Sequence, residues 1–204
     1  MEPVSTIVAF LANFAPALTA PTLENLGVLL RGAHLATGPR TVTGCLKAAW
    51  PWVTKHWSAY ENVFGRARLN LLVLGRLLFR LALTLVPPEA VILLVVDESL
   101  VRRYGPFVPG VGMHRDSVRS SRGRHQVTPG HKWVTLGVVV WLPFMGRPVA
   151  LPVLSVLYTA EKQAKRNRRG PLHRVRRMAT ELALLMVRWV VRWAPERQFR
   201  LVGD

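Results

Sequence analysis

Two aspartates stand directly after apolar segments, and their spacing suggests metal chemistry. Asp97 follows the run Val91–Val96, and Asp204 comes two residues after the segment Phe199–Val202. Two carboxylates brought close together repel each other, and a divalent cation that prefers oxygen ligands, Mg²⁺ or Mn²⁺, offsets the repulsion. Such ions position an attacking water or hydroxyl and stabilise the leaving oxygen in phosphodiester chemistry. We therefore predict that Asp97 and Asp204 are catalytic metal ligands; the alternative is that each caps the turn after its strand.

The predicted elements around these residues explain how they meet. A run of β-branched residues and leucine, as in Val91–Val96, is typical of a strand buried on both faces. Two more strands form a hairpin, a helix follows from about residue 172 to 193, and a last strand reaches Asp204; the hairpin strands are Trp133–Leu142 and Pro148–Tyr158. A right-handed crossover through the helix makes the last strand parallel to the first. Both aspartates then lie at neighbouring strand ends, where open α/β sheets bind ligands.

The chain changes character at Pro87-Pro88. Before this point the apolar spacing is helical, and prolines stop the preceding helix. We predict two domains, a helical and DNA-binding region over 1–86 and an α/β region over 87–204. The segment Glu98–Lys132 is rich in Gly, Pro, Arg and His, and we predict a long loop there.

Composition indicates a polyanionic partner. The net charge is +17 and the pI is about 11.7, whereas a fold alone requires no such excess. DNA binding through phosphates is the expected use; the alternative for each basic run is a solvated surface. The predicted DNA-binding residues lie in the long loop and in the basic segment before the helix: Arg115, Arg119, Arg122, Arg124, Lys132, Lys162, Lys165, Arg166, Arg168 and Arg169.

Several segments together resemble the DDE transposases of bacterial insertion sequences. These segments are VILLVVDES (91–99), YGPFVPGVGMHRDSVRSS (104–121), GHKWVTLGVVV (130–140) and RLVGD (200–204), with KHWSAYENVFGRARL (55–69) upstream. The resemblance implies a ribonuclease H-like core with a mixed sheet: three antiparallel strands, a crossover helix and a fourth strand parallel to the first. It makes Asp97 and Asp204 the first and second catalytic Asp. It also implies Mg²⁺ or Mn²⁺ as cofactor, and DNA, as transposon ends and target, as partner in cleavage and joining. The implied setting is the bacterial cytoplasm, on the nucleoid, with a homo-oligomer on DNA and no membrane.

Two departures from the family pattern concern its acids. The family often has a second Asp after the first, and here the residue is Glu98, which a strand directs to the face opposite Asp97. The family's catalytic Glu lies downstream of its second Asp, so we expect an incomplete core, truncated at Asp204. Glu181 is an alternative third acid, although a glutamate in the first turn of a helix is commoner.

Other functions remain as alternatives. A catalytically inactive, truncated transposase would act only as a DNA-binding protein, and a membrane-surface protein would use the apolar segment Leu69–Val86. The chain has a single cysteine, Cys45, which excludes an internal disulfide and a cysteine zinc site. Three histidines share the long loop, His114, His125 and His131, but their spacing does not favour zinc. We expect Asp116 to pair with a neighbouring arginine.

Overall fold

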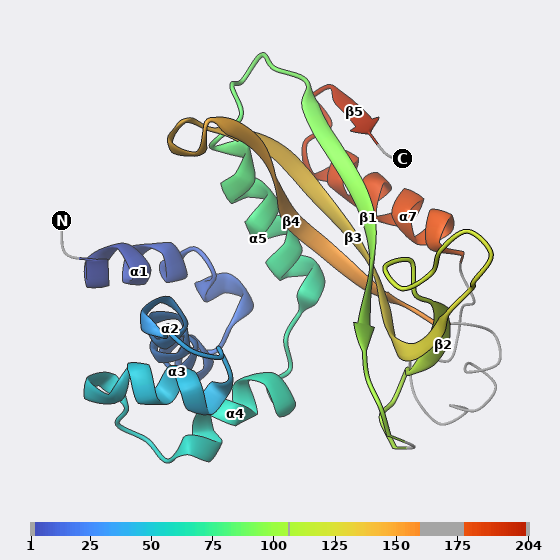
Figure 1. Ribbon diagram of the computed structural model, residues 1–204. Helices are drawn as coiled ribbons and strands as arrows, with labels where there is room; N and C mark the ends of the chain where they lie inside the picture. Colours follow the sequence, from blue (N-terminus) through green and yellow to red (C-terminus); the bar gives the residue numbers. More distant parts are fainter. Residues whose placement is uncertain (1–2, 106, 160–177, 203–204) are drawn as a thin grey trace. The chain divides into compact units, whose positions relative to one another are not determined.

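The computed structural model describes residues 3–105, 107–159 and 178–202, which form two compact units, Met1–Leu77 and Leu78–Asp204 (Figure 1). The division falls inside helix α5 (Leu71–Leu83), whose residues Phe79 and Ala82 belong to the core of the second unit. Within the described part of the chain, no helix combines the length and apolar character needed to cross a membrane.

The first unit is helical, as its spacing predicts. Its elements are α1 (Pro3–Ala12), η1 (Ala15–Ala17), α2 (Ala20–Leu35), α3 (Val42–Ala48), η2 (Trp50–Trp52) and α4 (Trp57–Gly65). Thr41 begins α3, because its Oγ1 accepts a hydrogen bond from the Gly44 amide at 3.1 Å. Helices α2 and α3 approach closely at Gly32, where a Cβ atom would lie 2.0 Å from the Cys45 carbonyl oxygen. The helices of this unit pack around a core that includes Leu29 and Tyr60.

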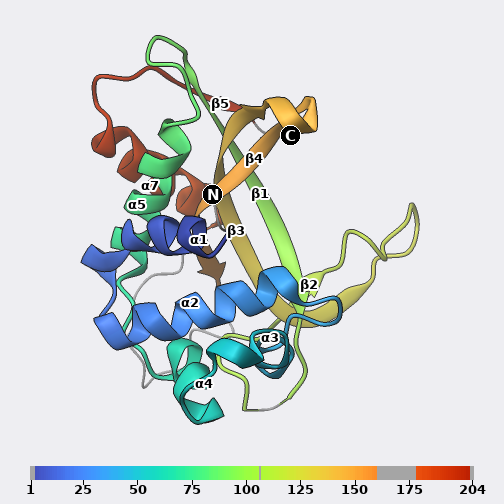
Figure 2. The same cartoon turned by 90° about the vertical axis from the view of Figure 1, so that its left-hand side faces the viewer.

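The second unit is built on a mixed five-stranded sheet. Its strands are β1 (Ile92–Arg102), β2 (Gly112–Arg115), β3 (Val127–Leu142), β4 (Arg147–Tyr158) and β5 (Phe199–Val202). The long strand β3 pairs antiparallel with β1 on one edge and with β4 and the short β2 on the other. Strand β5 pairs with β1 and is parallel to it. Helix α7 (Ala179–Trp193) precedes β5 and lies on one side of the sheet (Figures 1 and 2).

Alternation along the strands separates two faces of this sheet. We call one of them the core face, because its side chains pack against helix α7. The core includes Leu94, Val134, Leu136 and Val138 of the sheet and Met186 and Val190 of α7. All six residues are 0% exposed. The predicted fold class is therefore confirmed: three antiparallel strands, a crossover helix, and a further strand parallel to the first.

Two sequence predictions about the strands are wrong. The first strand does not end at Asp97 but continues to Arg102, because β3 pairs with it from Leu94↔Val138 to Arg102↔Gly130. The predicted loop 98–132 is consequently much shorter, since it contains the end of β1, all of β2 and the first residues of β3. These strand segments contain polar residues and glycine, which are not typical of strands. They are extended because they pair with residues far away in the sequence.

Candidate active site

Asp97 lies in the middle of β1, on the face of the sheet opposite the core. It pairs with Thr135 of β3, which pairs in turn with Ser155 of β4. Directly paired residues share a face, and the Thr135 Oγ1 and Ser155 Oγ atoms are 3.0 Å apart. The Asp97 side chain is exposed, and its Oδ1 accepts a hydrogen bond from the Glu98 amide at 2.8 Å. A polar row of a carboxylate and two hydroxyls thus crosses the sheet on what we call the Asp97 face.

Glu98 lies on the core face, as the strand alternation predicts. It forms an ion pair with Lys132, whose Nζ lies 5.6 Å from the centroid of the Tyr158 ring. Lys132 therefore neutralises Glu98 on the side of the sheet away from Asp97. Its predicted contact with DNA remains a prediction.

The parallel ladder between β1 and β5 ends shortly before the two aspartates in the sequence. The described ladder runs from Ile92↔Phe199 to Val95↔Val202. Asp97 lies two residues after Val95 in the sequence, and Asp204 lies two residues after Val202. Asp204 itself is outside the described residues. So are five of the predicted DNA-binding residues: Lys162, Lys165, Arg166, Arg168 and Arg169.

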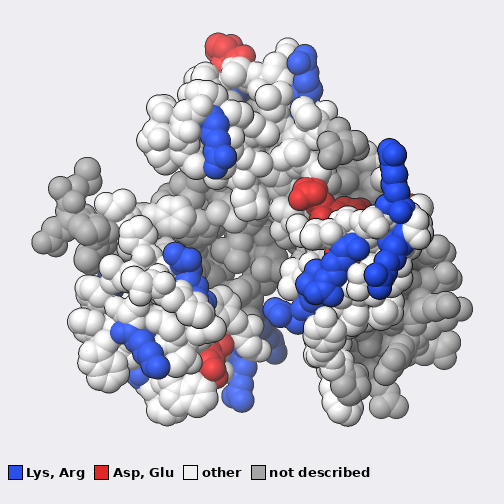
Figure 3. All heavy atoms as spheres, viewed as in Figure 1, with Lys and Arg blue, Asp and Glu red and all other residues white. Residues whose placement is uncertain are grey.

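The four other predicted DNA-binding arginines are exposed. Arg115 ends β2 and lies on the Asp97 face, whereas the loop after β2 holds the other three, Arg119, Arg122 and Arg124. In the sheet unit, a small acidic area is bordered by a group of Lys and Arg side chains (Figure 3). Arg115 thus adds a positive charge to the face of the sheet that carries Asp97.

Asp116 organises this basic loop from a buried position. Its Oδ2 accepts hydrogen bonds from Arg102 at 3.0 Å and Thr128 at 3.2 Å, and its Oδ1 accepts one from the Arg119 amide at 3.2 Å. Burial alone would raise the pKa of Asp116, but the Arg119 amide, the Arg102 guanidinium and the Thr128 hydroxyl together lower it. The expected arginine partner is thus Arg102, and Asp116 has a structural role.

The loop histidines do not converge. His114 of β2 is buried on the core face, and its ring centroid lies 5.9 Å from that of Tyr158. His131 lies on the Asp97 face, where its Nε2 is 2.8 Å from the Pro109 carbonyl oxygen. Within residues 3–105, 107–159 and 178–202, no three His, Cys, Asp or Glu side chains gather closely enough to hold a metal ion.

Glu181 lies in the first turn of α7, and its Oε2 accepts a hydrogen bond from the Met178 amide at 2.7 Å. Helix α7 packs on the core face through Leu182 and Met186, whereas Asp97 lies on the other face. Glu181 is therefore the N-terminal helix glutamate that was expected to be the commoner case.

A family comparison connects this geometry with known chemistry. The model of a family described as DDE superfamily endonuclease matches residues 13–204, which is nearly the whole chain. The chain belongs to the DDE superfamily endonucleases. The match covers Asp97 and Asp204 and confirms the resemblance found in the sequence. No curated protein and no solved structure matches the chain.

Membership of the DDE superfamily makes DNA the implied substrate, and its nucleases generally use divalent metal ions. The donor chemistry of the Asp97 face fits such an ion, because a carboxylate is a ligand that Mg²⁺ and Mn²⁺ prefer. Asp97 carries no ionic partner among the described residues. The exposed carboxylate is therefore accessible to a cation.

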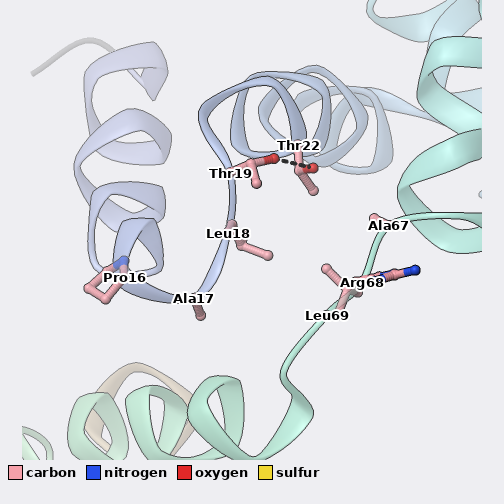
Figure 4. Close-up of a pocket in the computed structure, with 8 residues that line it drawn as sticks. All are labelled: Pro16, Ala17, Leu18, Thr19, Thr22, Ala67, Arg68 and Leu69. Carbon is pink, nitrogen blue, oxygen red and sulfur yellow. Dashed lines mark hydrogen bonds between the residues drawn. The ribbon is translucent and has the colours of Figure 1, made fainter.

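Two further features were not predicted from the sequence. The hydroxyl groups of Thr135 and Ser155 beside Asp97 were missed, although Thr135 is the polar residue of an otherwise apolar stretch, 133–142. The helical unit also has a pocket of about 400 Å³ between the α1–α2 and α4–α5 connections (Figure 4). Thr19 and Thr22 share a hydrogen bond of 2.9 Å at its edge, and Arg68 is its charged lining residue.

Proposed function

We propose that this DDE superfamily protein is a transposase that cleaves and joins DNA strands of a bacterial insertion sequence with Mg²⁺ or Mn²⁺. The observation that carries the proposal is the exposed Asp97 carboxylate, on the face of the sheet away from the core and beside the parallel β1–β5 pair. Asp97 and Asp204 are the proposed metal ligands. The described ladder ends two residues before each of them.

The bound ion would polarise a phosphate oxygen and supply a nucleophile at neutral pH. The protein's own contribution is to hold the Asp97 carboxylate rigidly. Strand β1 is paired with β3 on both sides of Asp97, at Val96↔Leu136 and Glu98↔Val134. The Glu98 amide orients the carboxylate by donating a hydrogen bond to its Oδ1 atom.

The exposed basic residues of the sheet unit would hold the DNA backbone. Arg115 shares the Asp97 face, and its pairing partner, Val127, lies eight residues along β3 from Thr135. At a rise of about 3.3 Å per residue the two positions are about 26 Å apart, or about eight base-pair steps of a duplex. A duplex that lies along β3 would contact both positions. The helical region 1–86 is proposed to bind DNA as well.

The test is nicking of supercoiled DNA by the full chain in the presence of Mn²⁺. We expect nicking by the wild type and its loss in Asp97→Asn, which keeps the shape of the side chain but removes its charge. Glu98→Gln is the matched control, because it changes the adjacent carboxylate, which lies on the core face with Lys132. We expect Glu98→Gln to nick at a rate within about twofold of the wild type, because the Glu98 side chain lies on the face opposite Asp97. A tenfold change in rate would require about 1.4 kcal/mol at the reacting centre.

The outcomes separate the proposed enzyme from a DNA-binding protein without activity. DNA binding with no Mn²⁺-dependent nicking would identify an inactive transposase. Equal activity in the wild type and in Asp97→Asn would remove Asp97 from the site. Partition onto anionic vesicles with no affinity for DNA would instead favour a membrane-surface protein.

A further inference from the structure

The tip of the β3–β4 hairpin exposes a cluster of large apolar side chains. Phe144 is 84% exposed, Trp141 57% and Met145 40%. A single exposed apolar residue needs no explanation, but a contiguous group of them marks an interaction site. The segment from Trp141 to Pro148, WLPFMGRP, contains one charged residue, Arg147. The tip is thus an apolar projection with a cation at its base.

The tip has a fixed backbone. Pro143–Met145 forms a turn of 3-10 helix, and the Gly146 amide donates to the Pro143 carbonyl oxygen at 3.2 Å. Gly146 has φ +62°, a conformation that favours glycine. The pair Leu142↔Arg147 then closes the hairpin ladder. Because the turn is already ordered, Phe144 and Met145 can enter a partner without a further loss of backbone entropy.

The shape and charge of the tip favour duplex DNA over another protein as its partner. A stable protein–protein interface requires about 20–30 residues on each side, whereas this tip offers a few residues on a narrow turn. Proteins that insert apolar wedges between DNA base steps need one or two such residues, because basic side chains elsewhere supply the affinity. A chain with a net charge of +17 meets that condition. Duplex DNA is therefore the partner that fits.

We propose that Phe144 and Met145 form a wedge that inserts between base pairs of duplex DNA and kinks it, while Arg147 contacts the adjacent phosphate. This inference rests on the proposed function, in which the sheet unit binds DNA at Asp97. Leu142, the last residue of β3, lies seven residues along the strand from Thr135, the partner of Asp97. This separation is about 23 Å, or about seven base-pair steps. The wedge would thus distort the duplex within one helical turn of the reacting phosphate.

The test uses the full chain and a duplex that carries 2-aminopurine at a single TA step, since pyrimidine–purine steps unstack easily. A dye at each end of the duplex reports bending by energy transfer. The fluorescence of 2-aminopurine reports unstacking of its base step. We expect the wild type to raise both signals, the 2-aminopurine fluorescence and the energy transfer between the end dyes. Phe144→Ala should remove both and weaken binding by about tenfold, the effect of one lost contact between an aromatic ring and a base. Phe144→Leu should retain them, because leucine is also a wedge residue.

Leu184→Ala is the matched control, because Leu184 is 53% exposed and lies on helix α7, outside the regions that are proposed to bind DNA. We expect it to behave as the wild type, and circular dichroism checks that each variant is folded. Wild-type binding without a rise in either signal, or unchanged signals in Phe144→Ala, would overturn the wedge and leave the proposed nuclease intact. Absence of duplex binding by the wild type would overturn both proposals. A loss of self-association in Phe144→Asp without DNA would show that the tip contacts a second copy, which also overturns the wedge.

Discussion

The crossover helix α7 should control the stability of the sheet through Met186. This side chain is 0% exposed and packs in the core with Leu94, Leu136 and Val190. Met186→Ala removes three heavy atoms, which corresponds to about 2.4 kcal/mol of transfer free energy at about 0.8 kcal/mol per group. The cavity that remains raises the expected loss of unfolding free energy to about 3–5 kcal/mol.

Hydrogen–deuterium exchange of peptides from β1 and β5 measures this loss in the sheet unit itself. Leu184→Ala is the control on the same helix, because Leu184 is 53% exposed and its loss should cost about 0.5 kcal/mol or less. Met186→Leu should cost less than about 1.5 kcal/mol, since it keeps most of the volume. If Met186→Ala and Leu184→Ala had equal effects, the packing of α7 on the core face would be refuted.

Three further predictions concern local structure. Burial first, and then the charges of Lys132 and His131, lower the pKa of His114; the unfolded state therefore binds the proton more readily, and stability should fall as pH drops from about 6.5 toward the lowered value. Urea unfolding at a series of pH values should show a smaller acid-induced decrease in stability for His114→Gln than for the wild type, and an equal decrease in both proteins would contradict the burial of His114. Gly130→Ala should destabilise the sheet by about 1–3 kcal/mol in the same measurement, because its Cβ would lie 2.6 Å from the Val101 carbonyl oxygen; Gly38→Ala, with open space around it, is the control, and equal effects would contradict the close pairing of β1 and β3. Thr41→Ala should cost about 1 kcal/mol in thermal unfolding through loss of the α3 cap, and an equal cost in Thr43→Ala would show that the cap is misassigned.

The order of the strands was predictable because it depends on local patterns. The apolar run at Val91–Val96, the hairpin and the segment Phe199–Val202 were each recognised from their own residues, and a helix before the last strand implies a parallel crossover. The strand Phe199–Val202 was predicted with its observed bounds.

The second half of β1 and the whole of β2 were not predictable in this way. Residues 98–102 mix charged and apolar types, and they are extended because β3 pairs with them. The burial of His114 and Asp116 has the same origin, since Thr128 of β3 and Arg102 of β1 surround them only after the strands associate. Trp50 and Trp57 are exposed in the structure, although tryptophan in a helical unit usually packs inside.

The alternation of β1 makes two adjacent acids depend on strand register. Asp97 lies on one side of the sheet and Glu98 on the other, beside Lys132. A codon inserted or deleted within Ile92–Val96 would exchange the two sides. The glutamate would then lie on the face that now carries the aspartate, and the aspartate would lie on the face that carries the lysine. We expect genes of this family to tolerate changes of residue type in this strand far better than changes in its length.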